Sequence, residues 1–381
     1  MKTVQRIGVI GGGQLGRMFA LDAKRMGYHV TTLDPQEHSP CGQVADEQIV
    51  AAYDDLAAIE ELGRSSDVIT YEFENISIES VRHLESLAHR VSPGSSVLRV
   101  TQDRLLEKEF VRAQGLETTE FAAVSNLDDD LARAAGEIGF PAILKTVRGG
   151  YDGKGQWRAD SLEEAQAAFA AASGAALIFE QLVPLACELS VIATRDAKGE
   201  IVTYPVAENT HDRGILAMTV APARVDSAIA AKAAEMAAIV GRGLRIVGTY
   251  CLELFLSTQG RLLVNEIAPR PHNSGHYTID VTPCSQYEQH VRAICDLPLS
   301  PPRLFTNAIM INVLGAGTGD HLDGVADLLR DPAIVLHVYG KRHAVARRKM
   351  GHFTMLVDRP VDDAAIAAAE AAHAKLSWSQ C

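Results

Sequence analysis

The chain has 381 residues, of which 47% are hydrophobic and 22% are charged, and it carries a formal net charge of −12. This length exceeds one ordinary hydrophobic core, so we expect two or three domains. The acidic balance and the lack of a long apolar run exclude nucleic acid and a membrane as expected partners, and six cysteines without a C-x-x-C pair predict a reducing, cytoplasmic location.

Short apolar strands alternate with helices in the first part of the chain, which predicts a parallel, doubly wound sheet. A glycine-rich turn, G-x-G-x-x-G over Gly11–Gly16, follows the first strand. Its spacing, with Asp34 at the end of the next strand, is that of a dinucleotide-binding loop. Such a turn brings backbone amides at a helix N-terminus to an anion, and NAD is only one such anion. Helices are predicted over 14–26, 54–62 and 77–89, followed by a helical connector that ends at Gly115.

A strand that ends in Lys145 precedes the glycine-rich segment "RGGYDGKGQ", and a capping box starts a helix at Ser161. A buried ammonium needs an anionic partner, and the glycines free backbone amides to approach phosphate oxygens. The segment is not a Walker A loop, because Gly155 replaces the Ser or Thr after Lys154. The glycines alone fit a mobile surface loop equally well, but the strand lysine favours a nucleotide.

Longer strands of antiparallel style follow, with an alanine-rich helix over 226–243 and a hairpin near residue 260. If Gln259-Gly260 forms a two-residue turn, Glu253 lies directly opposite Glu266. Facing carboxylates destabilise a sheet unless a cation lies between them, and Mg²⁺ prefers such oxygens. The alternative is a solvated pair on an exposed face, but the flanking residues are apolar.

Two further polar clusters follow the hairpin. Arg270, His272, Asn273 and His276 come just after Glu266, and this density favours a site over single structural histidines. A proline-rich linker over 297–303 then leads to a small, mainly β unit with a basic segment. This segment is either a solvated face or a site for a phosphomonoester. Its basic residues are Lys341, Arg342, Arg347, Arg348 and Lys349.

A strand lysine, a glycine-rich flap and a carboxylate pair on antiparallel strands resemble the ATP-grasp enzymes. Over nearly the whole chain, "GGGQLGRM", "YEFEN", "LKT.RGGYDGKGQ", "NEIAPRPHNSGH" and "RKMGH" resemble the N5-carboxyaminoimidazole ribonucleotide synthase family, the ATP-dependent carboxylating ligases of purine biosynthesis. The implied fold is mixed α/β and α+β. The implied domains are a Rossmann-like, pre-ATP-grasp domain over 1–105, an ATP-grasp domain over 106–300 with a lid over about 116–187, and a β-rich domain over 301–381.

The resemblance also implies an ATP site with Mg²⁺ as cofactor. Glu253 and Glu266 would bind Mg²⁺. Two Mg²⁺ ions are expected to accompany ATP. Many ATP-grasp enzymes have an Asn where this chain has Ala268, so a second ion is expected to have fewer protein ligands. The residues implied at ATP are Arg104, Lys145, Gly150, Tyr151, Asp152, Gly153, Lys154, Gly155, Gln156, Glu188, His211, Asn265 and Glu266, with Glu180, Gln181, Leu182 and Val183 at the adenine and ribose.

The second substrate implied by the resemblance is 5-aminoimidazole ribonucleotide. Its expected contacts are Gln14, Leu15, Glu72, Asn273, Lys341, Arg348 and Lys349, and the residues expected at the reacting centre are Tyr151, Asp152, Arg270, His272 and Asn273. Bicarbonate would attack the γ-phosphate of ATP to give carboxyphosphate and ADP, and the amine would capture the CO₂ released. Either Asp152 or phosphate would take the amine proton. A homodimer and a separate mutase that receives the product are also implied, without NAD or biotin.

Other functions share some of these sequence features. The formate-dependent glycinamide ribonucleotide transformylases share the "PRPH" turn and the basic tail, but not "GGGQLG", "PHNSGH" and "RKMGH"; the chain is short for a biotin carboxylase. An NAD-dependent oxidoreductase would explain the opening motif and Asp34, but it has no use for Glu253 opposite Glu266. A non-enzymatic nucleotide-binding scaffold is the remaining alternative.

Overall fold

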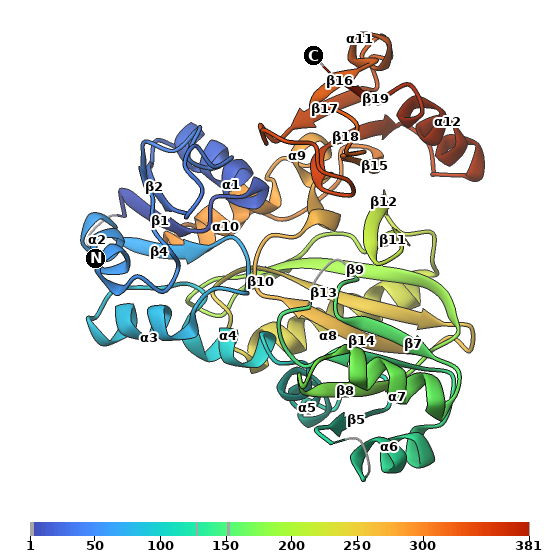
Figure 1. Cartoon of the computed structure of the whole chain (residues 1–381). Helices are drawn as coiled ribbons and strands as arrows, with labels where there is room; N and C mark the ends of the chain where they lie inside the picture. Colours follow the sequence, from blue (N-terminus) through green and yellow to red (C-terminus); the bar gives the residue numbers. More distant parts are fainter. Residues whose placement is uncertain (1–3, 127–128, 151–152, 381) are drawn as a thin grey trace.

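The computed structural model describes residues 4–126, 129–150 and 153–380 (Figure 1). The N-terminal part contains a parallel four-stranded sheet of order β3-β2-β1-β4, as the alternating pattern predicts. Helices start where a side chain caps them, at Asp55 for α2 and at Ser77 for α3. The elements are β1 (Arg6–Ile10), α1 (Gln14–Arg25), β2 (His29–Leu33), β3 (Glu47–Ile49), α2 (Leu56–Ser65), β4 (Val68–Tyr71) and α3 (Ile78–Ser86).

Two connecting helices lead to a second, antiparallel sheet of order β5-β8-β6-β7, which shares one apolar core with α6 and α7. The Ser161 hydroxyl accepts from the Glu164 amide and begins α7, as predicted. This unit lies at the lower right of Figure 1. The elements are α4 (Ser95–Thr101), α5 (Arg104–Ala113), β5 (Phe121–Val124), α6 (Asp130–Ile138), β6 (Ala142–Thr146), β7 (Gln156–Ala159), α7 (Leu162–Ala171) and β8 (Leu177–Gln181).

A large antiparallel sheet forms the centre of the molecule, in the order β14-β13-β9-β11-β12-β15-β18-β17, with β10 paired to β9. One face packs against α8 in the largest apolar core. The elements up to the hairpin are β9 (Leu185–Arg195), β10 (Ile201–Thr203), β11 (Ala207–Asp212), β12 (Ile215–Ala221), α8 (Ser227–Gly243), β13 (Gly248–Ser257) and β14 (Leu262–Ala268).

The central sheet continues into the last part of the chain, because β12 pairs with β15 across the boundary predicted at residue 300. Before that point, α10 packs against α1 and completes the core of the N-terminal sheet with Tyr287, Val291 and Ile294. The elements are η1 (Asn273–Gly275), α9 (Thr278–Val281), α10 (Gln286–Ile294), β15 (Asn307–Leu314), β16 (His321–Asp323), α11 (Val325–Leu328), β17 (Ile334–Val338), β18 (Lys349–Val357), α12 (Asp363–His373) and β19 (Ser377–Ser379). Within the described ranges, no helix is long and apolar enough to cross a membrane.

The β13–β14 hairpin has a different turn from the one predicted. Ser257 N donates to Arg261 O at 2.9 Å, so the loop contains three residues, and Gly260 occupies its left-handed position with φ +77°. The longer loop shifts the register by one residue. A β-bulge at Asn265 shifts it back, so that Glu253 pairs with Glu266 as expected. The predicted two-residue turn was wrong, but the predicted carboxylate pair is confirmed.

Candidate active site

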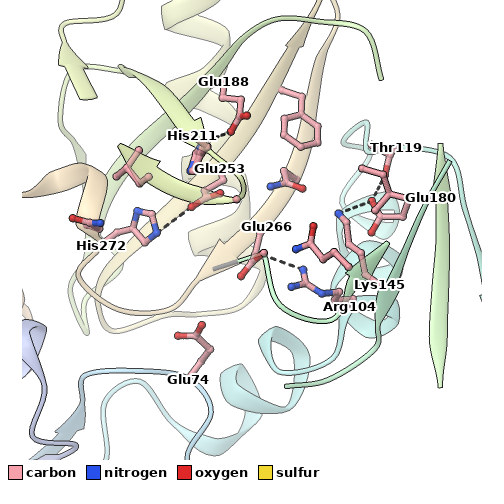
Figure 2. Close-up of a pocket in the computed structure, with 18 of the residues that line it drawn as sticks. Glu74, Arg104, Thr119, Lys145, Glu180, Glu188, His211, Glu253, Glu266 and His272 are labelled. Carbon is pink, nitrogen blue, oxygen red and sulfur yellow. Dashed lines mark hydrogen bonds and ion pairs between the residues drawn. The ribbon is translucent and has the colours of Figure 1, made fainter. Parts of the chain in front are cut away.

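A cavity of about 730 Å³ lies where the N-terminal part, the second sheet and the central sheet meet (Figure 2). The first part contributes Gln14–Leu15 and 72–75, the second contributes Lys145 and Glu180–Val183, and the central sheet contributes both hairpin carboxylates. It brings together most of the residues expected from the sequence: Gln14, Leu15, Glu72, Arg104, Lys145, Gly153, Gln156, Glu180, Gln181, Leu182, Val183, Glu188, His211, Glu253, Asn265, Glu266, Arg270, His272, Asn273 and Lys349.

Lys145 has the anionic partner that its buried position demands. Its Nζ lies 3.2 Å from Glu180 Oε2, which also accepts from the Thr119 hydroxyl at 2.9 Å. A second buried ammonium, on Lys108, lies 3.3 Å from the same oxygen. Burial favours protonation of Glu180, but Lys145 and then Lys108 outweigh it and lower its pKa to about 2. The group therefore carries one net positive charge at the cavity wall.

Each hairpin carboxylate faces a cation or a proton donor. Glu266 Oε2 lies 3.1 Å from Arg104 Nη1, and Glu253 Oε1 lies 3.0 Å from His272 Nε2 (Figure 2). Burial alone would raise the pKa of Glu253, but the hydrogen bond from His272 lowers it. The Ser274 amide donates to His272 Nδ1, which assigns the ring proton to Nε2. Glu253 is thus held ionised.

His211 and Glu188, both expected at the nucleotide, form an ion pair with 2.5 Å between Nδ1 and Oε2. Burial, the largest single influence, lowers the pKa of His211, but the hydrogen bond and charge of Glu188, together with the charge of Glu253, raise it above its ordinary value. Apolar side chains line the same region, and no motif in the sequence marked them because they are spread over four strands. They are Ile143, Leu185, Leu216 and Phe255.

Three amides of the glycine-rich turn after β1 donate to carboxylates of the chain itself. Gly13 N and Gly16 N donate to the Glu72 carboxylate, and Gly12 N donates to Asp34 Oδ2 at 2.7 Å. Two carboxylates of the chain thus occupy the positive end of α1. The expectation that the amides of this turn approach a ligand anion is wrong for Gly12, Gly13 and Gly16, whereas Gln14 and Leu15, the first residues of α1, line the cavity. Glu72 follows β4, which is next to β1, so adjacent strand ends explain the contact.

Glu74 and Lys108 are the charged residues that sequence reasoning missed. Glu74, in the motif "YEFEN", lines the cavity and pairs through both carboxylate oxygens with Arg270. The two-residue spacing from Glu72 was the available signal. Lys108 lies behind the cavity on a helix, where a lysine is ordinarily solvated. No signal in the sequence marked it.

Asn273 also lines the cavity and is 5% exposed. Among the described residues, neither the oxygen nor the nitrogen of its amide has a hydrogen-bond partner. The Asn265 side-chain oxygen is in the same state. Buried polar atoms are normally satisfied, so both amides fit a ligand-binding role.

Some expected residues do not line the cavity in the described structure. Tyr151 and Asp152 lie outside the described residues. Lys341 Nζ donates to the Lys349 carbonyl at 2.7 Å, and Arg348 Nη1 donates to the His343 carbonyl at 3.2 Å, so of the basic tail it is Lys349 that reaches the cavity. The expected residues away from its lining are Gly150, Lys154, Gly155, Lys341 and Arg348.

Known protein families match all three parts of the chain. Three family models match in succession: a ribonucleotide synthetase preATP-grasp domain over 1–102, an ATP-grasp domain over 109–287, and a phosphoribosylaminoimidazole carboxylase C-terminal domain over 308–365. The N5-carboxyaminoimidazole ribonucleotide synthase of Bacillus subtilis is 45% identical over 361 residues, which cover 94% of this chain and 92% of the relative.

Two solved structures show the same fold. An ADP complex of an N5-carboxyaminoimidazole ribonucleotide synthetase superposes with a TM-score of 0.92 at 43% identity, over 98% of each chain. The Aspergillus clavatus enzyme, in complex with ADP and 5-aminoimidazole ribonucleotide, has a TM-score of 0.89 at 30% identity over 98% of this chain and 97% of that one. On motifs, fold and cavity alike, the chain belongs to the N5-carboxyaminoimidazole ribonucleotide synthase family of ATP-grasp ligases.

Proposed function

We propose that the protein uses ATP and bicarbonate to carboxylate the exocyclic amine of 5-aminoimidazole ribonucleotide, with release of ADP and phosphate. The observation that carries this proposal is the content of one cavity, whose lining includes the Lys145–Glu180 pair, the facing carboxylates Glu253 and Glu266, and Gln14 and Asn273. A ligase must bring a nucleoside triphosphate and an acceptor to one point, and a single cavity lined by all these groups suits that task.

The ATP end combines charge with an apolar wall. We propose that Lys145 and Arg104 bind phosphate oxygens, and that Glu180 to Val183 at the end of β8 contact the adenine and ribose beside Phe255 and Ile143. The net positive charge of the Lys145–Lys108–Glu180 group supports this placement. We expect the Glu188–His211 ion pair, which also lines the cavity, to complete the ATP site.

The facing carboxylates fit a magnesium site. Glu253 and Glu266 present oxygens from paired positions of one hairpin, and the bulge at Asn265 adds an unpartnered amide oxygen beside them. We propose that Glu253 and Glu266 hold Mg²⁺. When bound, Mg²⁺ supplies positive charge that offsets the phosphate oxygens of ATP. Arg104 pairs with Glu266 and His272 pairs with Glu253, which positions the two carboxylates.

The reaction brings bicarbonate and ATP, both anions, into contact, so positive charge at the reacting centre lowers the repulsion between them. Arg270 and His272 line the same cavity as the metal carboxylates and Asn273, and there they would hold bicarbonate and carboxyphosphate. Gln14, Glu72, Asn273 and Lys349 would bind the ribonucleotide. The roles of Tyr151, Asp152, Lys341 and Arg348, closure of the glycine-rich flap, and a cytoplasmic homodimer that passes its product to a separate mutase stay predictions.

The proposal is tested by measuring ADP release from ATP by the purified protein. We expect ADP to form at a rate that depends on both bicarbonate and 5-aminoimidazole ribonucleotide. Stimulation by formate with glycinamide ribonucleotide alone would contradict the proposal. A thermal shift with NAD but not with ATP would favour an oxidoreductase, which the occupied amides of the glycine-rich turn already disfavour.

A further inference from the structure

Glu74 and Arg270 form a buried ion pair that joins the N-terminal part of the chain to the central sheet. Arg270 Nε lies 2.5 Å from Glu74 Oε2, and Nη2 lies 3.1 Å from Oε1. The two side chains are 12% and 14% exposed, and both line the cavity. Two parallel hydrogen bonds of this kind fix the plane of a guanidinium as well as its position.

The hydrogen bonds of Arg270 determine which of its N–H groups remain for a ligand. A guanidinium has five N–H groups. Glu74 takes one from Nε and one from Nη2, and the Pro271 carbonyl accepts one from Nη1 at 3.2 Å. Among the described residues, one N–H on Nη1 and one on Nη2 are left. This pair of donors matches two oxygens of a planar, carboxylate-like anion.

The alternative partners of Arg270 are close by. Burial lowers the pKa of Arg270, but Glu74 raises it most and Glu266 raises it as well, so the hairpin carboxylates lie within its electrostatic reach. Without Glu74, the guanidinium would be free to pair with Glu266, which is one of the proposed magnesium ligands. Such a pairing would compete with the metal and leave bicarbonate without its donors.

The segment that carries Glu74 is itself held in place. The Gln102 side-chain amide donates to the carbonyls of Glu74 and Ile76 at 2.6 and 2.8 Å. Gln102 lies two residues before Arg104, at the start of the helix that serves the nucleotide end. Glu74 is therefore fixed relative to the ATP site, and Figure 2 shows it on a separate segment below Glu266.

We propose that Glu74 is a positioning residue that holds Arg270 with two N–H groups directed at bicarbonate and away from the metal carboxylates. This inference rests on the proposed function, because it assigns the bicarbonate subsite of that reaction. It predicts that Glu74 acts through Arg270, on bicarbonate and Mg²⁺, and has little effect on the binding of either nucleotide.

The test compares the wild type with Glu74→Gln, which keeps the shape and removes the charge. We expect the KM for bicarbonate to rise about tenfold or more, as for the loss of hydrogen bonds to a charged group. The KM values for ATP and the ribonucleotide should change by less than about threefold. The Mg²⁺ concentration at half-maximal rate should also rise. Asp296→Asn, which breaks the bidentate pair with Arg90 away from the cavity, is the matched control.

The outcomes are distinguishable. If ADP release by the wild type does not depend on bicarbonate, the proposed function itself is overturned. An active wild type with an unchanged bicarbonate KM in Glu74→Gln, or an equal change in every KM, overturns the role of Glu74. If Glu74→Gln folds poorly, Arg270→Lys serves instead: a lysine cannot form the fork, so the same selective rise in the bicarbonate KM is expected, and an unselective loss would contradict the inference.

Discussion

The charged groups around the cavity pair with one another before any substrate enters. Glu253 faces His272, Glu266 faces Arg104, Glu74 faces Arg270, and Glu180 faces two lysines. Losing one partner of a buried pair leaves an uncompensated charge and is therefore costly. Single substitutions in this network should thus have different effects on stability and on turnover.

Glu266→Ala tests the metal pair. We expect turnover to fall about a thousandfold, because one of the two facing carboxylates is lost where positive charge must gather at the phosphates. The unfolding midpoint should fall only slightly, since the loss of the pair with Arg104 is offset by removal of the like-charge contact with Glu253. ADP release and a thermal melt measure the two quantities. Full activity in a folded variant would instead support a nucleotide-binding scaffold.

Lys108→Met tests the lysine behind the cavity. Its ammonium is 2% exposed and also donates to the hydroxyls of Thr118 and Thr119. Removing it leaves Glu180 with a single cation, so we expect a loss of about 3 kcal/mol in the free energy of unfolding. Urea denaturation measures this loss. The exposed Lys232→Met is the control and should change the same quantity by less than about 0.5 kcal/mol; equal effects would contradict the argument.

The sequence predicted which strands and helices exist better than it predicted the turns between strands and the order of strands in the sheets. The parallel sheet, the capped helix at Ser161 and the carboxylate hairpin were all predicted, because periodicity and capping are local signals. The three-residue turn and the bulge at Asn265 were not, since a bulge leaves the apolar pattern nearly unchanged. The partners of the Gly13 and Gly16 amides depend on which strands are neighbours, which no local pattern shows.

Gly13→Ala tests the contact between the first turn and Glu72. A Cβ at this position would lie 2.4 Å from Glu72 Oε1, so the carboxylate would have to leave the amides of α1. We expect the free energy of unfolding to fall by about 2 kcal/mol and the KM for the ribonucleotide to rise. Gly136→Ala, in α6 with no atom within 4 Å, is the control and should be neutral or stabilising. Equal stability of the two variants would argue against the contact.

Two buried histidines connect the last strands of the molecule to the segment that follows the hairpin. His276 follows the hairpin and His352 lies on β18, with ring centroids 4.6 Å apart. Tyr287 and Tyr339 hydroxyls bond their Nδ1 atoms. Burial is the main cause that keeps the pKa of both rings well below the ordinary value, and neighbouring histidines lower it further. Both histidines are therefore neutral in the folded protein.

This neutrality predicts a loss of stability in mild acid. Because the folded pKa values are depressed, the unfolded chain binds more protons below about pH 6.5, and stability falls as the pH decreases through that point. Each ring should contribute up to about 1.4 kcal/mol per pH unit. Urea denaturation at several pH values from 7.5 to 5 measures the slope. His352→Gln should make it shallower, whereas the exposed His38→Gln should not; an unchanged slope in His352→Gln would contradict the assignment.

The continuous central sheet has a consequence for the order in which the chain can fold as it is synthesised. β12 has an open hydrogen-bonding edge until β15 (Asn307–Leu314) has left the ribosome, and the N-terminal core stays uncovered until α10 (Gln286–Ile294) follows. A chain that stops near residue 300 would therefore retain an exposed edge strand that invites pairing with other copies. Pairing of β15 with β12 would thus protect the newly synthesised chain from aggregation through this edge.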